Sequence, residues 1–121
     1  MYNETVMRYF KKPQNVGIID NPDGYGCFED TANTNVIEIF LKVKDGKIQD
    51  IKFRTFGCVA AIASSVAVTM MAKGKTLKDA ERISGADVVS ELGGLPDAKK
   101  HCSVLAVNGL RSAINNCRKK S

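Results

Sequence analysis

The chain has no segment suited to a membrane or to export. No run approaches the roughly 18 consecutive apolar residues that span a bilayer, and no apolar signal-peptide core stands near the N-terminus. The four cysteines, at positions 27, 58, 102 and 117, do not form the disulfide framework of a small secreted protein. These absences argue against a membrane protein and favour a reduced, cytoplasmic setting.

The signatures of nucleic-acid binding and of common enzymes are also missing. Lys and Arg outnumber Asp and Glu by 18 to 13, which gives a net charge of +5. The basic residues are scattered in short clusters, with no aromatic-rich basic motif, so a solvated surface or an acidic protein partner explains them better than nucleic acid does. No nucleophile–base pair for hydrolysis and no phosphate-binding loop is present, so we expect no enzyme activity.

The pattern of apolar residues predicts one α+β domain over residues 1–121, built on a small antiparallel sheet. Apolar and charged residues alternate over 37–43 and again over 51–55, as in half-buried strands. Asp45-Gly46 between them is a strong hairpin signal. Residues 14–34 are rich in Gly, Asn, Asp and Pro and predict a loop, with a short edge strand near 25–28.

Helices are predicted before and after these strands. Pro13 ends the first, and Gly74 ends a nearly uncharged helix that we expect to be buried against the sheet. The predicted helices are about 2–10, 59–72, a short one capped by Thr76 with Asp79, another before Gly93-Gly94, and about 100–118. We expect them to pack mainly on one face of the sheet.

Two cysteines and the only histidine stand where the chain passes into a helix. Cys58 ends Thr55-Phe56-Gly57-Cys58, between a predicted strand and the buried helix, and His101-Cys102 opens the last helix. The N-terminal end of a helix favours thiolate, the form that binds metal or attacks sulfur. We therefore predict that the sulfurs of Cys58 and Cys102 approach within one metal site. Two cysteines and one histidine do not complete a four-ligand site.

Cys117 is predicted to belong to the core. It follows Val107, Leu110 and Ile114 at helical spacing, on the apolar side of the last helix. It also lies fifteen residues beyond Cys102 in that helix, or about 22 Å at roughly 1.5 Å per residue. Cys117 is therefore not expected to share a site with Cys102.

Three blocks of motifs follow one another along the chain. The first is Arg8-Tyr9-Phe10 with Pro13-Gln14-Asn15-Val16-Gly17, and the second is Phe53-Arg54-Thr55-Phe56-Gly57-Cys58 with Ala61-Ile62-Ala63-Ser64-Ser65. The third comprises Lys73-Gly74-Lys75-Thr76-Leu77, Leu95-Pro96 and Lys99-Lys100-His101-Cys102-Ser103-Val104-Leu105-Ala106. Together they resemble the IscU/NifU N-terminal-domain family of iron–sulfur cluster scaffolds, over nearly the whole chain. The resemblance implies an IscU/SufE-like fold.

The resemblance also implies a function. Iron and sulfide would assemble into a [2Fe–2S] cluster on Cys58, His101, Cys102 and a fourth group, and the cluster would pass to apoproteins. A cysteine desulfurase would be the partner that supplies sulfur. Two alternatives stay open: a zinc-bound sulfur acceptor for the desulfurase, or a regulatory or adaptor paralogue that has lost cluster binding.

The chain departs from the family pattern in two motifs. The family's Ala-Cys-Gly-Asp is here Ala32-Asn33-Thr34-Asn35. Asn33 and Asn35 thus replace a thiolate and a carboxylate with amides, which cannot ionise. The family's Leu-Pro-Pro-Val-Lys is here Leu95-Pro96-Asp97-Ala98-Lys99, which weakens the case for an Hsp70-type chaperone as a partner.

Cys27 is the candidate for the missing thiolate. It lies six residues before Asn33 in a Gly-rich segment, from which it could complete the metal site. The alternative, slightly favoured, is an ordinary half-buried strand residue. Glu29 and Asp30 nearby are possible carboxylate ligands, although acidic loop residues are usually only solvated.

Overall fold

Three antiparallel strands form the sheet in this computed structural model, which describes residues 1–120. The strands are β1 (Gly24–Asp30), β2 (Asn35–Lys44) and β3 (Lys47–Phe56), and they pair in the order β1-β2-β3. Asp45 and Gly46 join β2 to β3 with φ angles of 55° and 75°, the left-handed conformations that a tight hairpin turn requires. The predicted strands and hairpin are confirmed, and the edge strand is longer than expected.

Five α-helices accompany the sheet within the described residues, and the predicted helices are confirmed. Side chains of Asn3, Thr76 and Ser84 cap three of the helices by accepting hydrogen bonds from backbone N–H groups. The helices are α1 (Glu4–Lys11), α2 (Val59–Ala72), α3 (Leu77–Ala80), α4 (Gly85–Glu91) and α5 (His101–Lys120), with 3₁₀ turns η1 (Thr31–Asn33) and η2 (Asp97–Lys99). None of the helices in residues 1–120 is long and apolar enough to cross a bilayer.

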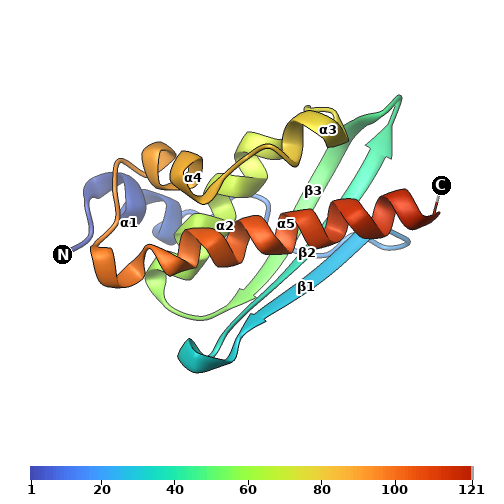
Figure 1. Cartoon of the computed structure of the whole chain (residues 1–121). Helices are drawn as coiled ribbons and strands as arrows, with labels where there is room; N and C mark the ends of the chain where they lie inside the picture. Colours follow the sequence, from blue (N-terminus) through green and yellow to red (C-terminus); the bar gives the residue numbers. More distant parts are fainter. Residues whose placement is uncertain (121) are drawn as a thin grey trace.

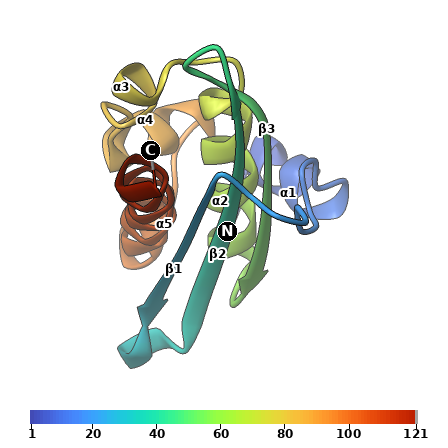
Figure 2. The same ribbon diagram turned by 90° about the vertical axis from the view of Figure 1, so that its right-hand side faces the viewer.

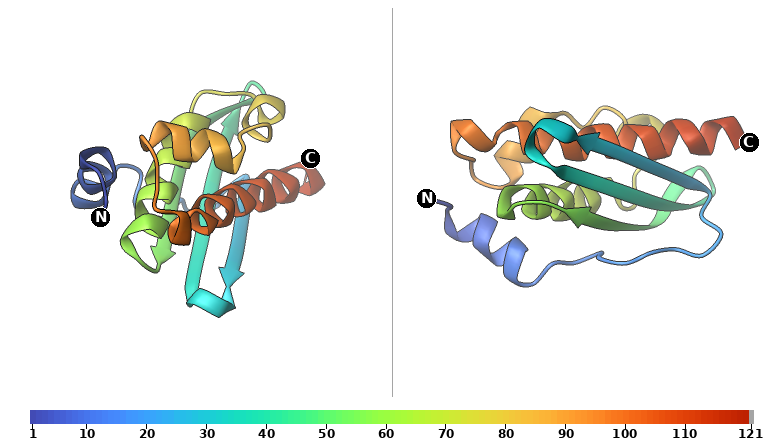
Figure 3. Two further views of the ribbon diagram at one scale, coloured as in Figure 1. Left: turned by 60° about the vertical axis from the view of Figure 1, so that its left-hand side comes forward. Right: turned by 90° about the horizontal axis from the view of Figure 1, so that it is seen from below.

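The helices α2, α4 and α5 lie on one face of the sheet, as Figures 1 and 2 show. Helix α1 packs against α2 rather than against a strand, so it lies beside the sheet (Figure 3). The other face of the sheet carries Tyr25, Glu38, Phe40 and Arg54, and Arg54 forms an ion pair of 2.8 Å with Glu38. The α+β fold with helices mainly on one face is therefore confirmed.

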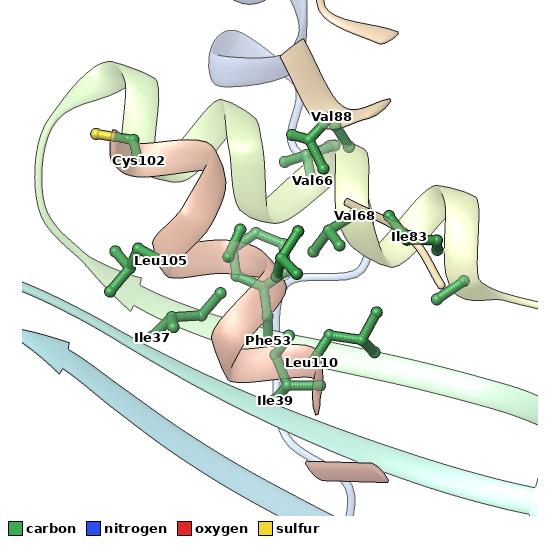
Figure 4. Packing of buried hydrophobic residues seen from close by; sticks show 14 of the residues in the cluster. Ile37, Ile39, Phe53, Val66, Val68, Ile83, Val88, Cys102, Leu105 and Leu110 are labelled. Carbon is green, nitrogen blue, oxygen red and sulfur yellow. The ribbon is translucent and has the colours of Figure 1, made fainter. Parts of the chain in front are cut away.

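The core lies between this helical layer and the inner face of the sheet. Figure 4 shows Leu110 of α5 beside Phe53 and Ile39 of the sheet, and Val66 of α2 beside Val88 of α4, all almost completely buried. Gly26 lets α5 approach β1 closely, because a Cβ at this position would collide with the backbone nitrogen of Ala113. Cys117 is buried at 8% exposure, and its predicted place in the core is confirmed.

Candidate functional site

Cys58 and Cys102 meet where β3 ends and α2 and α5 begin. Cys58 is the N-cap residue of α2, in an extended backbone conformation, and Cys102 is the second residue of α5. Their sulfurs lie 3.6 Å apart, and both thiols are free. The predicted approach of these two cysteines is confirmed. In Figure 4 the sulfur of Cys102 is directed away from the labelled core side chains.

His101 and Asp30 extend this pair toward the solvent. The Nε2 atom of His101 lies 3.6 Å from the sulfur of Cys102 and 3.9 Å from Oδ2 of Asp30. About a third of the His101 side chain is exposed, whereas Cys102 is fully buried. The site therefore has a buried sulfur at its base and an imidazole and a carboxylate at its mouth.

Burial determines the protonation of Cys102. Desolvation raises the pKa of this thiol to about 12, the hydrogen bond and charge of Cys58 add to the rise, and the positive charge of Lys99 opposes it. For Cys102 the raised pKa runs against the expectation that a helix N-terminus favours thiolate, and desolvation is its largest cause. The thiol is neutral at physiological pH, and a metal that binds its sulfur must displace a proton.

Asn35 and Gly57 pack together beneath the two sulfurs. Asn35 is 2% exposed, and its Nδ2 lies 3.9 Å from the sulfur of Cys102. A Cβ at position 57 would collide with the side-chain oxygen of Asn35 and lie 3.0 Å from its Cγ. The absence of a side chain at Gly57 thus lets the strand-to-helix turn that carries Cys58 sit against Asn35.

Asn33 is not directed at the thiols as a substitute ligand. It lies in the exposed turn η1, and its Nδ2 donates a hydrogen bond of 2.8 Å to Oδ2 of Asp30. The sequence indicates a lost ligand at Asn33 and leaves Asp30 open as a possible carboxylate ligand or a solvated acid. The signal that could have linked them is their spacing of three residues around a turn.

Cys27 is not brought to the paired thiols. It pairs in register with Glu38 on β2, and Glu38 in turn pairs with Arg54, so Cys27 belongs to the exposed face of the sheet. Burial and the charges of Glu38 and Glu29 raise the pKa of its thiol. The structure thus places Cys27 away from the paired thiols and favours the alternative of a strand residue, which is exposed rather than half-buried.

Cys58, Cys102, His101 and Asp30 lie next to one another in that order, but they do not surround a common point. Two thiolates bound to one tetrahedral metal at about 2.3 Å would lie about 3.8 Å apart, close to the observed 3.6 Å. Within residues 1–120, no three or more His, Cys, Asp or Glu side chains are arranged so that they could hold a metal ion. Closing the site therefore requires side-chain rotation at its mouth.

The sequence is similar to one protein family and to several known proteins. It matches the family described as "NifU-like N terminal domain" over residues 1–121. It is 49% identical over 114 residues to "Iron-sulfur cluster assembly scaffold protein IscU 1" of Archaeoglobus fulgidus, covering 94% of this chain and 74% of the relative. It is 42% identical over 123 residues to "Iron-sulfur cluster assembly scaffold protein IscU" of Escherichia coli K12, covering 98% of this chain and 95% of the relative.

Solved structures share the fold. The N-terminal part of a nitrogen-fixing NifU-like protein from Brucella abortus superposes with a TM-score of 0.82 at 15% identity, covering 98% of this chain and 95% of that one. A structure described as a putative iron–sulfur cluster assembly scaffold protein for the SUF system, from Fervidobacterium islandicum AW-1, gives 0.77 at 21% identity, covering 93% and 96%. The resemblance seen in the motifs is thus confirmed, and the chain belongs to the NifU-like N-terminal-domain family that contains the IscU scaffold proteins.

Proposed function

We propose that this protein is an iron–sulfur cluster assembly scaffold that receives iron and sulfur at Cys58 and Cys102, with His101, and passes a [2Fe–2S] cluster to apoproteins. The distance of 3.6 Å between the two sulfurs carries the proposal, since it is close to the about 3.8 Å that separates two thiolates on one tetrahedral metal. Family membership supports the same conclusion. Iron and sulfide are the cargo of this activity.

The site is shaped for loading and release rather than for permanent storage of metal. His101 is partly exposed at its mouth, and two apolar side chains beside the cysteines are exposed as well: Phe56 at 83% and Val104 at 51%. Apolar side chains left exposed beside a binding site are available for contact with a partner protein. We assign these contacts to a cysteine desulfurase that delivers sulfur and to the apoproteins that accept the cluster.

A second candidate is a zinc-bound sulfur acceptor for a cysteine desulfurase. The observation in its favour is that only two thiolates meet at the site, together with nitrogen and oxygen groups that suit zinc. The third alternative, an adaptor without cluster chemistry, rests on the loss of ionisable groups at Asn33 and Asn35. Both alternatives are outcomes of the experiment below.

Two other features of the chain bear on its cellular compartment and on binding to an Hsp70-type chaperone. All four cysteines are free, which fits a reduced compartment such as the cytoplasm. The segment Leu95–Lys99 buries Leu95 and continues through Pro96 into η2. Its sequence departs from the motif that Hsp70-type chaperones recognise in the family, so we propose no such partner.

Anaerobic reconstitution with ferrous iron and sulfide tests the proposal. We expect the native protein to develop the visible absorption of a [2Fe–2S] cluster, and Cys58→Ser and Cys102→Ser to lose it. Cys117→Ala is the matched control: it removes a thiol elsewhere in α5 and should keep loading, at a cost in stability of about 1 kcal/mol. Loading that survives both Ser variants would refute the proposal. Zinc binding without a cluster would favour the sulfur acceptor, and binding of neither would favour the adaptor.

A further inference from the structure

We propose that Asp30 is the third anionic ligand of the metal site and that Asn33 is its positioning residue. The inference rests on the proposed function, because it takes Cys58 and Cys102 as metal ligands. Asp30 would be the fourth ligand beside Cys58, His101 and Cys102. Asn33, which replaces a cysteine of the family motif, would orient this carboxylate and would not itself bind the metal.

Among the candidate ligands of β1, Asp30 is the one that lies on the side of the strand facing α5. Successive strand residues point to opposite faces, and Gly24 and Gly26 face α5. Asp30 is four residues after Gly26, so it faces α5 as well, where His101 and Cys102 begin the helix. Cys27 lies at an odd position of the same strand and belongs to the opposite face, whereas Glu29, also at an odd position, still borders the pocket that Asp30 and His101 line. Asp30 also pairs in register with Asn35, whose side chain touches Cys102.

Three consecutive distances, from Cys58 through Cys102 and His101 to Asp30, are close to those between neighbouring ligands of one metal ion. Bonds of about 2.3 Å to sulfur and about 2.0–2.2 Å to nitrogen and oxygen place tetrahedral ligands about 3.8 Å (S–S), 3.6 Å (S–N) and 3.4 Å (N–O) apart. The observed separations are 3.6 Å for Cys58–Cys102, 3.6 Å for Cys102–His101 and 3.9 Å for His101–Asp30. A shift of about half an ångström at the carboxylate would bring the last pair into the same range.

Asn33 holds the carboxylate in place. Its amide donates 2.8 Å to Oδ2 of Asp30, while no interaction within residues 1–120 engages Oδ1. Metal-bound carboxylates are commonly oriented by such a hydrogen bond. Asp30 and His101 also line one pocket of about 290 Å³, together with Glu29 and Val104.

The ligand set defines the class of metal. Two thiolates, one carboxylate and one neutral imidazole give three negative charges, so a divalent ion would leave a net charge of −1. Mixed sulfur, nitrogen and oxygen donors suit borderline ions such as Zn²⁺ and Fe²⁺. Asp30 would thus replace the charge of the missing thiolate with a harder donor.

Zinc titration of the reduced, metal-free protein against a chromophoric chelator tests the inference. We expect Asp30→Asn to weaken Zn²⁺ binding at least about 10- to 100-fold and Asn33→Ala to weaken it less, since a positioning residue acts through its ligand. Asp45→Asn is the matched control, because it removes the same charge by the same substitution in the exposed turn between β2 and β3. Asp30→Glu, which keeps a carboxylate, should recover part of the affinity. Far-UV circular dichroism verifies that each variant is folded.

Cobalt substitution supplies a second readout. With Co²⁺ alone, Asp30→Asn should keep the sulfur-to-cobalt charge-transfer absorption of two thiolates while its d–d bands shift, and Asp30→Cys should increase the charge-transfer intensity. Asp30→Asn with native Zn²⁺ affinity and native d–d bands would overturn the inference. Zinc titration of Cys58→Ser in parallel separates the two proposals. If Cys58→Ser binds Zn²⁺ as tightly as the native protein, the thiolate site itself is refuted. If Cys58→Ser loses Zn²⁺ binding while Asp30→Asn keeps it, only the role of Asp30 is refuted.

Discussion

Gly57 is the residue whose replacement most directly tests how the site is packed. Its backbone is not in the left-handed region, so alanine introduces no conformational strain there. The added methyl would instead collide with the buried oxygen of Asn35 and lie 3.2 Å from the Cβ of Ala61. We expect Gly57→Ala to destabilise the protein by forcing Asn35 away from its place beside Cys102.

The size of the effect follows from two opposing contributions. Overpacking a buried site by one methyl costs about 1–3 kcal/mol, and the reduced freedom of the unfolded chain returns about 0.4–1 kcal/mol. A net loss of about 1–2 kcal/mol remains. For 121 residues, an unfolding entropy of about 2.1 cal/mol/K per residue converts each kcal/mol into about 4 °C of Tm. The expected decrease is therefore about 4–8 °C.

Calorimetry of the metal-free protein, combined with a double-mutant cycle, measures this effect. Asn35→Ala removes the oxygen with which the new methyl group collides, so the penalty of Gly57→Ala should largely disappear in the Asn35→Ala background. Residues in contact typically show couplings of about 0.5–3 kcal/mol, and we expect about 1–2 kcal/mol here. Strictly additive losses, or a Gly57→Ala variant as stable as the native protein, would refute the contact between Gly57 and Asn35.

Three further predictions concern the thiols. Because the pKa of Cys102 rises from 9.0 to about 12 on folding, the folded state keeps a proton that the unfolded state loses between these pH values. The free energy of unfolding, measured with urea, should therefore fall as the pH rises from about 9 to 12. The fall should be less steep in Cys102→Ala. Asn33→Cys should raise cluster yield in anaerobic reconstitution well above that of the native protein, since it restores a third thiolate, and an unchanged yield would contradict this. Cys27→Ser should leave cluster absorption and far-UV circular dichroism unchanged, whereas reduced loading would show that the strand moves to deliver Cys27.

Local physical rules account for how well the fold could be predicted from the sequence. Alternation along 37–43 and 51–55, the Asp45-Gly46 turn and the capping of α3 by Thr76 are all short-range effects, and each element was placed within a few residues. The edge strand β1 was predicted too short because its glycines weaken any strand signal. Those glycines are required by the close approach of α5, a tertiary contact that no local pattern reveals.

The candidate site also has parts that local sequence patterns predict and parts that they do not. Cys58, His101 and Cys102 stand at element boundaries, and the meeting of the two thiols followed from that position. The high pKa of Cys102 could not be predicted, because it depends on how completely α2 and α5 exclude water from the sulfur. The contact of Asn33 with Asp30 was missed because it depends on where β1 ends and on which face Asp30 lies.

The replacements at Asn33 and Asn35 look different once their contacts are known. Asn35 is buried beneath the sulfurs beside Gly57, where an unpaired carboxylate would be costly and would raise further the pKa of a thiol that burial already keeps neutral. Asn33 is exposed and engages the nearest carboxylate. The two amides therefore act at different depths: one keeps the base of the site uncharged, and the other orients a charge at its mouth. A scaffold with this arrangement would bind metal through buried sulfur and exchange it through exposed oxygen and nitrogen, which suits a cargo that must leave.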